Sequence, residues 1–336
     1  MSQAYFQVKI LDSRRGAYLA VLDIERKILG HLAEVSLLTV DSAEEVIEEL
    51  ENADAIISWH HIALTRNVLF RMRHCRGVVR ASVGYDNIDL EAATEAGILV
   101  SNVPDYGVEE VSDHTMALIL ALVRKIPVLD RHCREGGWEW RTAGSILRLR
   151  GATLGIVGLG RIGSAVARRA VAFGLDVVFF DPYLPSGIEK AHGIRRSESL
   201  QELLRSSQIL SLHVPLTPET RGMIGRKEIL QLPPGAIVVN TCRGEVIQQQ
   251  ALIEELESGH IGQAGLDVLE REPHVPEELR NSNRVLLTAH SAFYADSSLQ
   301  ELRSKAALAA LRFLTGQPQR NLLNRIASAQ TVTAST

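Results

Sequence analysis

Short apolar runs alternate with amphipathic segments along most of the chain, and this alternation predicts an α/β fold. In the first hundred residues, strands are predicted at 6–11, 35–40, 55–58 and 77–80, with a helix inside 19–32. Ser42 is followed three residues later by Glu45, a capping box that predicts a helix reaching residue 50. Strands separated by helices pair in parallel, so residues 1–102 are predicted to form a doubly wound parallel-sheet domain.

The same alternation returns after residue 150 and continues almost to the end of the chain. Strands are predicted at 154–157, 177–180, 209–212, 236–240, 264–268 and 285–288, and the clearest helix between them at 250–258. A further helix is capped at 295–298 and runs to residue 314, ahead of Gly316 and Pro318. We expect this long helix to pack back on the first domain. Residues 328–336 are small and polar and are expected to fray.

Two segments between the predicted domains differ from the rest. Residues 108–125 have the pattern of a helix that is apolar on every side from Met116 to Val123, which predicts burial between domains or in a subunit interface. Residues 134–151 are polar, contain Trp138 and Trp140, and are predicted to form an exposed loop.

A glycine motif joins the strand at 154–157 to the helix that follows it. The spacing is Gly158-x-Gly160-x-x-Gly163, and the next strand ends on an acid, Asp181, which lies 18 residues past the last glycine. Glycines at this spacing allow a tight turn, close approach of a pyrophosphate, and close packing of helix on sheet. The acid can accept hydrogen bonds from a ribose diol and repel a 2′-phosphate, which favours NAD over NADP. A glycine turn that binds no nucleotide remains the alternative.

Composition narrows the class of protein further. The chain has 336 residues, which suggests two domains, and it is 46% hydrophobic with a net charge of −4 from 36 basic and 40 acidic residues. This balance gives no sign of a nucleic-acid or membrane-surface partner. The first residues lack the apolar core of a signal peptide, and no run reaches transmembrane length. Three cysteines without a C-x-x-C pair are expected to be reduced thiols in the cytoplasm.

Polar side chains cluster where the predicted strands end, which is where ligands bind in open α/β sheets. Arg80 through Gly84 follow one strand and His213 with Pro215 follow another. Thr241, Cys242 and Arg243 follow a third, and the last two strands lead to Asp267, Glu272 and His290. An arginine, a glutamate and a histidine are therefore expected beside a nucleotide fold.

These motifs, in this order, resemble the D-isomer-specific 2-hydroxyacid dehydrogenases. The resemblance rests on G-L-G-R-I-G, D-P-Y, N-T-C-R-G, G-L-D-V-x-E-x-E-P and T-A-H, and spans residues 58 to about 323. The segments R-A-S-V-G-Y-D-N-I-D and H-S-A-F-Y-A-D are similar to the C-terminal-binding-protein (CtBP-like) branch. The resemblance implies two Rossmann-like doubly wound domains. A flavodoxin-like substrate domain would comprise residues 1–102 and 295–336, with an NAD-binding Rossmann domain, residues 103–294, inserted into it.

The resemblance also implies the catalytic roles. Arg243 would bind the substrate carboxylate through its guanidinium, and His290 would exchange a proton with the substrate oxygen. Glu272 would orient the His290 ring and stabilise its protonated form. Glu270 lies close enough in the sequence to be confused with Glu272, and a surface salt bridge is the alternative for Arg243.

The remaining site residues follow from the same resemblance. Backbone N–H groups of Val83 and Gly84 would hold the carboxylate, while Arg80 would either face the pocket or pair with an acid of its own domain. Trp59, His60 and Phe293 would line the acyl pocket, and no metal site is expected at the adjacent His60 and His61. The expected NAD-binding set is Gly158, Gly160, Arg161, Ile162, Gly163, Asp181, His213, Pro215, Thr220, Thr241, Cys242, Asp267 and Thr115.

The leading hypothesis is an NAD(H)-dependent enzyme that interconverts a 2-keto acid and its D-2-hydroxy acid, as a homodimer formed through residues 108–150. The chain departs from the family pattern at two positions. Ala289 stands where the family usually has a proline just before the catalytic histidine, and Phe293 stands where the C-terminal-binding branch has a tryptophan. An NAD-sensing protein-interaction module of the corepressor kind is the alternative from another class. Phosphoglycerate oxidation is a third possibility, against which the aromatic Trp59 and the absence of a regulatory segment count.

Overall fold

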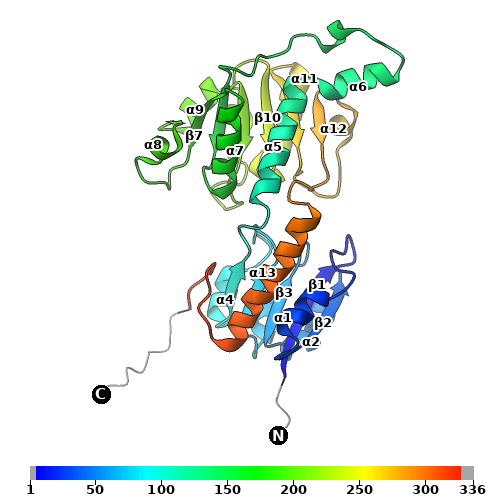
Figure 1. The fold of residues 1–336 in the computed structure, drawn as a ribbon, viewed down its shortest axis with the longest axis vertical. Helices are drawn as coiled ribbons and strands as arrows, with labels where there is room; N and C mark the ends of the chain where they lie inside the picture. The colour runs from blue at the N-terminus through cyan, green and yellow to red at the C-terminus, as the bar shows by residue number, and fades with distance from the viewer. Residues whose placement is uncertain (1–4, 327–336) are drawn as a thin grey trace. The chain divides into compact units, whose positions relative to one another are not determined.

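The computed structural model describes residues 5–326, and the expectation for residues 328–336 therefore lies outside the described residues. The chain divides into two compact units (Figure 1). One contains the residues up to Tyr106 together with those from Ala295 onward, and the other is Gly107–Tyr294. We call them the five-stranded unit and the seven-stranded unit after their sheets.

The five-stranded unit is a parallel sheet with helices on both faces. Its strand order is β2-β1-β3-β4-β5, and every pairing is parallel. The strands are β1 (Phe6–Ser13), β2 (Ala33–Val40), β3 (Ala55–Ser58), β4 (Gly77–Arg80) and β5 (Leu99–Asn102). The α-helices are α1 (Asp23–Leu29), α2 (Ile47–Glu51), α3 (Arg66–Arg71), α4 (Leu90–Glu95) and α13 (Asp296–Thr315), with a 3-10 turn at Ala43–Val46. The four strands and the capping box predicted here are confirmed.

One face of this sheet is covered by α13 and α1, which lie side by side in Figure 1. Helix α13 crosses β3 and β4 so closely that a Cβ on Gly77 would lie 2.5 Å from the ring of Phe313. Arg303 joins α13 to α1 by donating to the buried Glu25 over 2.8 Å. Residues of α2, α3 and α4 pack on the opposite face around Ile56, Val78 and Val100. The terminal helix thus returns to the first strands, as its length and capping suggested.

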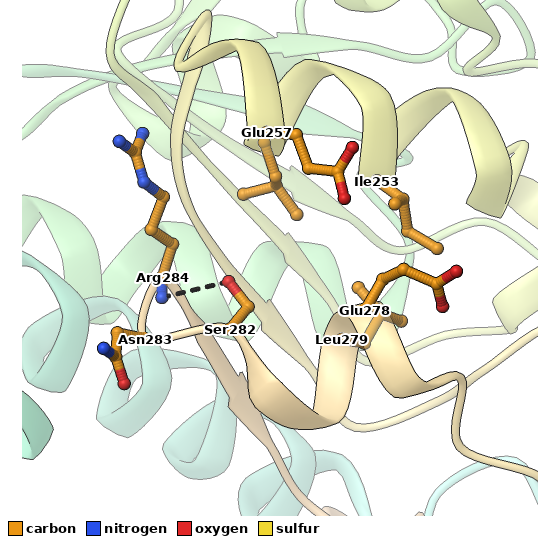
Figure 2. Close-up of a pocket in the computed structure, with 8 residues that line it drawn as sticks. Ile253, Glu257, Glu278, Leu279, Ser282, Asn283 and Arg284 are labelled. Carbon is orange, nitrogen blue, oxygen red and sulfur yellow. Dashed lines mark hydrogen bonds between the residues drawn. The ribbon is translucent and has the colours of Figure 1, made fainter.

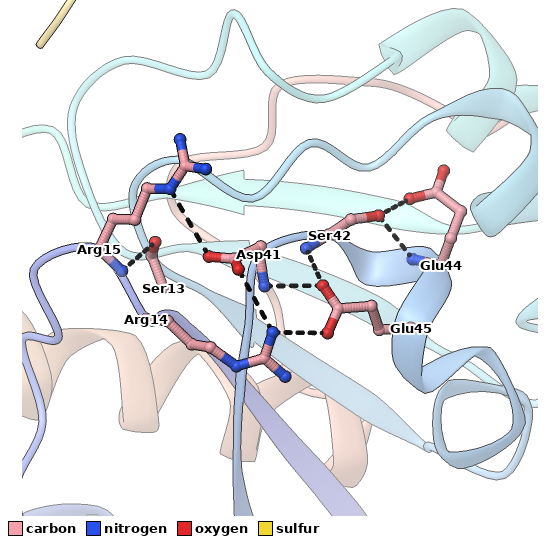
Figure 3. Close-up of polar contacts among 7 residues, drawn as sticks. All are labelled: Ser13, Arg14, Arg15, Asp41, Ser42, Glu44 and Glu45. Carbon is pink, nitrogen blue, oxygen red and sulfur yellow. Dashed lines mark hydrogen bonds and ion pairs between the residues drawn. The ribbon is translucent and has the colours of Figure 1, made fainter.

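A polar cluster joins the ends of β1 and β2 at the edge of this sheet (Figure 3). Arg14, just after β1, lies 2.8 Å from Glu45 Oε2 and 3.3 Å from Asp41 Oδ2, just after β2. Glu45 also accepts the N–H of Ser42 over 3.0 Å, which completes the capping box. These side chains are largely exposed, so solvent screens the ion pairs and they add little stability. The capping box therefore does more to start the helix than the ion pairs do to hold the edge.

The seven-stranded unit is also wholly parallel, with the order β12-β11-β10-β9-β6-β7-β8. Its strands are β6 (Thr153–Val157), β7 (Asp176–Phe180), β8 (Arg195–Arg196), β9 (Ile209–Leu212), β10 (Ala236–Asn240), β11 (Ile261–Leu266) and β12 (Val285–Leu287). Its helices are α5 (Val108–Val123), α6 (Ile126–Arg134), α7 (Arg161–Ala172), α8 (Ile188–His192), α9 (Leu200–Ser206), α10 (Arg226–Ile229), α11 (Gln249–Ser258) and α12 (Glu277–Asn281). Short 3-10 turns occur at Trp140–Ala143 and Gly244–Val246. Together the two sheets confirm the doubly wound α/β class.

Two layers of helix enclose this second sheet. Helices α5 and α7 lie side by side over one face (Figure 1), where Ile119 and Val166 join the core around Phe179. Helices α9 to α12 pack on the other face, with Leu203 and Leu252 against Val238. Because both faces are covered, the open positions lie at the strand ends.

Several details differ from the predicted pattern, among them strands β5 and β8, which were not predicted. Strand β11 begins at Ile261, three residues earlier than predicted, since Gly262 and Gln263 interrupt its apolar run. Helix α5 ends at Val123 rather than Lys125, which takes a left-handed φ of 58° before α6 begins. The segment after α5 is thus partly helical. Helix α5 is not buried on every side in the single chain, because Ala117 is exposed. No helix within residues 5–326 is long and apolar enough to cross a membrane.

Candidate active site

The glycine motif lies between β6 and α7, at the carboxyl end of β6. Gly158 has φ 89°, and a Cβ there would lie 2.6 Å from the carbonyl oxygen of His213. A Cβ on Gly163 would overlap the carbonyl of Gly158, so helix and loop need glycine at both positions. A Cβ on Gly160 would meet no atom within 4 Å. Gly160 therefore borders open space, whereas Gly158 and Gly163 are in close contact with the backbone.

The start of α7 presents backbone donors to that space. Ser164 makes the first N–H···O bond of the helix, to Gly160 over 2.9 Å, so the N–H groups of Arg161, Ile162 and Gly163 come before it. Asp181, just after β7, accepts the N–H of Leu159 over 3.0 Å. Free donors and the helix dipole favour an anion, while the adjacent carboxylate disfavours a second one. This donor set fits a dinucleotide pyrophosphate, with Asp181 near the ribose.

The turn after β9 contains three residues of the expected NAD-binding set, His213, Pro215 and Thr220. Thr220 donates to the carbonyl of Pro215 over 2.6 Å and accepts the N–H of Thr217, which closes the turn. The His213 ring is hydrogen-bonded to Ser211 over 2.8 Å, and burial lowers the pKa of His213 to about 3. This imidazole is therefore neutral at physiological pH, as suits a residue that packs rather than binds phosphate.

Three further residues of the expected NAD-binding set, Thr115, Thr241 and Cys242, are held by hydrogen bonds within the seven-stranded unit. Thr115 of α5 is buried, donates to the carbonyl of Val111 over 2.7 Å, and lies 2.9 Å from the hydroxyl of Thr241 after β10. The thiol of Cys242 donates to Asn240 Oδ1 over 3.1 Å, and burial raises the pKa of Cys242 to about 11. Thr115 thus positions Thr241, and the protonated Cys242 is a poor nucleophile.

Asp267 organises the loop that carries His290. It is 2% exposed, and its two carboxylate oxygens accept the N–H groups of Ser291 and Ala292 over 2.9 and 3.0 Å. Its Oδ1 also accepts the hydroxyl of Thr288 over 2.5 Å. His114 Nε2 of α5 lies 2.9 Å from the same hydroxyl, so His114 belongs to the same hydrogen-bond network. His114 was not predicted from the sequence, because it lies among other polar residues in the first half of α5 and belongs to no motif.

His290 and Glu272, which the resemblance implies as an acid–base pair, lie within hydrogen-bond distance of each other. Nδ1 of His290 lies 2.8 Å from Glu272 Oε2, and His290 adopts φ 50°. Burial would raise the pKa of Glu272, but the hydrogen bond and charge of His290, the Leu269 N–H and the charge of Arg243 together lower it. An ionised Glu272 only accepts, so Nδ1 carries a proton and Nε2 is the atom whose protonation can change.

Two more side chains approach this pair. The charge of Arg243 acts on Glu272, and Arg243 Nη1 donates to the carbonyl of Cys242 over 2.8 Å. The ring of Phe293 stands edge-on to His290, with centroids 6.4 Å apart. The seven-stranded unit therefore brings together a cation, a hydrogen-bonded histidine and carboxylate, and an aromatic ring.

The loop after β4 in the five-stranded unit is held by its carbonyl groups. Asn102 Nδ2 donates to the carbonyl of Val83 over 2.7 Å, and Ser82 Oγ donates to that of Gly84 over 2.6 Å. Within residues 5–326, the N–H groups of Val83 and Gly84 have no hydrogen-bond acceptor. Arg80 is buried and donates to the carbonyl of Ser58 over 3.2 Å. This loop can offer backbone donors to an anion.

Trp59 and His60 pack on one aromatic neighbour, Tyr18. The Trp59 ring is stacked on Tyr18 with centroids 5.1 Å apart, and the His60 ring is tilted against it at 4.9 Å. Both residues are buried. Their expected role in the acyl pocket stays a prediction.

A cavity of about 280 Å³ lies between α11 and α12 (Figure 2). Glu257 and Glu278 line it from the two helices, and Ser282 Oγ accepts the N–H of Arg284 over 3.2 Å at its edge. Ser282 and Arg284 precede β12, whereas His290 follows that strand. None of the predicted site residues lines this cavity, which is separate from the candidate active site.

A family model matches over half of the chain. It describes the NAD binding domain of the D-isomer specific 2-hydroxyacid dehydrogenases and covers residues 116–292. That range includes the glycine motif, Arg243, Glu272 and His290. The donor set described above therefore coincides with the matched domain.

Three relatives extend the match to nearly the whole chain. D-3-phosphoglycerate dehydrogenase of Methanocaldococcus jannaschii is 37% identical over 298 residues, 89% of this chain but 57% of the relative. Glyoxylate reductase of Korarchaeum cryptofilum is 38% identical over 288 residues, 84% of this chain and 86% of the relative. The structure of D-lactate dehydrogenase from Aquifex aeolicus with NAD and lactic acid is 30% identical, with a TM-score of 0.84, and covers 94% of this chain and 98% of that one.

Proposed function

We propose, since this chain belongs to the D-isomer specific 2-hydroxyacid dehydrogenase family, that it interconverts a 2-keto acid and its D-2-hydroxy acid with NAD(H). The observation that carries the proposal is the His290–Glu272 pair, set beside Arg243 in the unit that contains the glycine motif. The chain spans 57% of the length of the phosphoglycerate dehydrogenase relative, so the substrate of that relative is not assigned to this chain.

Arg243 is proposed to bind the carboxylate of the acid. A guanidinium matches a planar carboxylate with two parallel donors and polarises the neighbouring carbonyl. The N–H groups of Val83 and Gly84 supply further donors for a carboxylate. NAD(H), when bound, supplies or accepts the hydride.

His290 is proposed to move the proton. Because Glu272 holds the proton on Nδ1, exchange with the substrate oxygen occurs at Nε2. Glu272 is thus a positioning residue and His290 the catalytic acid or base.

Asp181 favours NAD over NADP in this proposal. Its carboxylate lies beside the glycine loop, bonded to the Leu159 N–H, where a ribose 2′-phosphate would meet like charge. The Asp181→Ala variant should therefore use NADPH better, relative to NADH, than the wild type does. The ratio of kcat/KM for the two cofactors measures it, and an unchanged ratio would show that Asp181 does not face the ribose.

A homodimer formed through residues 108–150 is also part of the proposal. Trp138 and Trp140 are 92% and 72% exposed, and α6 has no buried residue. Large exposed aromatics are unusual on a monomer and mark contact surfaces. Sedimentation equilibrium should give twice the chain mass, and Trp138→Ser with Trp140→Ser should reduce it to one; a wild-type monomer would contradict the proposal.

We place the chain, within the family, nearest in kind to the C-terminal-binding-protein branch, on the sequence segments described above. Physiologically we propose reduction of a 2-keto acid in the cytoplasm, where Cys75, Cys133 and Cys242 would stay as the free thiols seen here. The corepressor-like alternative shares the fold and the cofactor site. Turnover decides between them.

The test is an NADH absorbance assay against glyoxylate, hydroxypyruvate, phenylpyruvate, oxaloacetate and a branched aliphatic 2-keto acid. His290→Ala should lower kcat by about 10²–10⁴-fold, because no other group delivers the proton. Arg243→Ala should lower kcat/KM by about 10²-fold or more through loss of the charge-assisted pair. The preferred acid reports the size of the pocket.

His192→Ala and Arg195→Ala serve as matched controls, because both residues lie in the same unit and outside the site. Both should keep wild-type turnover. Tight NADH binding without turnover of any acid would overturn the dehydrogenase and favour the interaction module.

A further inference from the structure

A second pocket, in the five-stranded unit, has no part in the proposed chemistry. It measures about 210 Å³ and lies between β5, α13 and residues 319–321. Its wall includes Ser101 of β5, Lys305 and Arg312 of α13, and Arg320. We call it the β5 pocket. All of these residues belong to one unit, so the pocket does not depend on the other.

The charge of the β5 pocket is positive. Asp105 is its single carboxylate, and Lys305 Nζ lies 2.9 Å from Asp105 and 2.6 Å from Glu301. Neither Arg312 nor Arg320 pairs with a carboxylate among residues 5–326. Two guanidinium groups therefore keep uncompensated charge at one cavity.

Ser101 adds an observation independent of charge. It is 1% exposed, and its Oγ has no hydrogen-bond partner within the described residues. Its neighbour Val100 joins the core on the α2–α4 face, so alternation along β5 directs Ser101 to the α13 face, where the pocket lies. A buried hydroxyl without a partner is costly, and a ligand that accepts its proton would remove that cost.

We propose that the β5 pocket binds a phosphate group, either inorganic phosphate or the end of a small phosphate monoester. Arg312 and Arg320 supply two cations for a dianion, and Ser101 Oγ donates one hydrogen bond to it. The pocket is smaller than the roughly 300–1,000 Å³ of sites for drug-sized molecules, which limits the ligand to a phosphate with a short chain. The site is distinct from the pyrophosphate cradle at α7 and from Arg243.

The test is calorimetric titration of inorganic phosphate into the intact protein saturated with NAD, so that the cradle at α7 is filled. We expect a dissociation constant of about 1 mM or tighter, as suits a small anion. Arg312→Gln and Arg320→Gln should each weaken binding about tenfold or more, because each removes a charge-assisted bond. Arg73→Gln, an exposed arginine of the same unit outside the pocket, and Arg243→Gln should leave it unchanged.

Ser101→Ala distinguishes a ligand site from a packing role. The variant should bind phosphate about tenfold more weakly, yet melt at the same or a higher temperature without phosphate, because it loses only an unpartnered hydroxyl. A lower melting temperature with unchanged binding would show that Ser101 is structural and overturn its role.

Three probes separate the possible ligands. Glycerol 3-phosphate that binds more tightly than phosphate indicates a monoester, and equal or weaker binding indicates the free ion. Malonate that binds more tightly than both would overturn the assignment to phosphate. Absence of binding up to about 10 mM phosphate, or binding that Arg312→Gln and Arg320→Gln do not change, would overturn the site itself. None of these outcomes depends on turnover, so the dehydrogenase proposal stands or falls separately.

Discussion

The two units hold their strand-end loops by opposite chemistry. In the seven-stranded unit, the buried Asp267 accepts the N–H groups of Ser291 and Ala292, so the loop after β12 is held by its donors. In the five-stranded unit, Asn102 and Ser82 donate to the carbonyls of Val83 and Gly84, so the loop after β4 is held by its acceptors.

The difference decides what each loop can offer. A loop whose N–H groups are taken by an internal carboxylate has few backbone donors left and acts through a side chain, here His290. A loop whose carbonyls are taken keeps its N–H groups for an anion. The chemical character of the internal anchor therefore predicts whether a loop serves catalysis through a side chain or binding through the backbone.

Breaking the acceptor anchor should have the largest effect. In Asp267→Asn the amide NH₂ would face N–H donors, and two charge-assisted bonds to the His290 loop would be lost. We expect kcat to fall by about 10²-fold and the melting temperature to drop by several degrees. Steady-state kinetics and thermal melts measure both.

Asp176→Asn is the matched control, because Asp176 is exposed at the start of β7 in the same unit. It should change neither quantity. Unchanged kcat in Asp267→Asn would show that the loop is placed by other contacts and would remove Asp267 from the comparison.

Breaking the donor anchor should have a smaller effect of a different kind. In Asn102→Ala the Val83 carbonyl loses its donor, so the orientation of the N–H groups of this loop is no longer held. If those groups bind the carboxylate, KM should rise about tenfold with little change in kcat, the cost of roughly one hydrogen bond.

Asn52→Ala is the control here, since Asn52 also donates an amide hydrogen bond to a carbonyl, that of Glu48, in the same unit. A fall in kcat without a rise in KM for Asn102→Ala would contradict a binding role for the loop.

Much of this arrangement could be predicted from the sequence, because the patterns that predict it lie within short segments of the chain. Strands β3 and β4, the glycine motif and the capping box are read from neighbouring residues, and each is confirmed. Helix α6 was not predicted, because its few apolar residues follow directly on the apolar run that ends α5 and none of its residues is buried. Strand β5 was also missed, and with it the place of Ser101 and Asn102 on a sheet.

The contacts that hold the two loops could not be predicted from neighbouring residues. His114 and Thr288 are 174 residues apart in the chain, and Asn102 lies 19 residues from its partner Val83. No periodicity links such positions, because the contact exists only after the sheets form. The role of Asp267 at the cofactor stays a prediction from family resemblance, and its part in holding the loop after β12 could be found only in the structure.

The smallest expected effect concerns pH and separates the two loops again. Asn102 and Ser82 do not titrate near neutral pH, but the loop of His290 is joined to Glu272, whose pKa is held below its ordinary value of 4.5 by His290, despite the opposing effect of burial. A carboxyl with a lowered folded pKa stabilises the fold fully above its unfolded pKa and loses that contribution as pH falls through the folded one. Urea unfolding of wild type and Glu272→Gln should therefore differ most above about pH 5, and the two curves should converge as the pH falls below 4.5. The difference between wild type and Asn102→Ala should stay constant over the same range. A constant difference for Glu272→Gln as well would mean that the charge of Glu272 does not contribute to holding its loop, and the contrast between the two anchors would then rest on hydrogen-bond polarity alone.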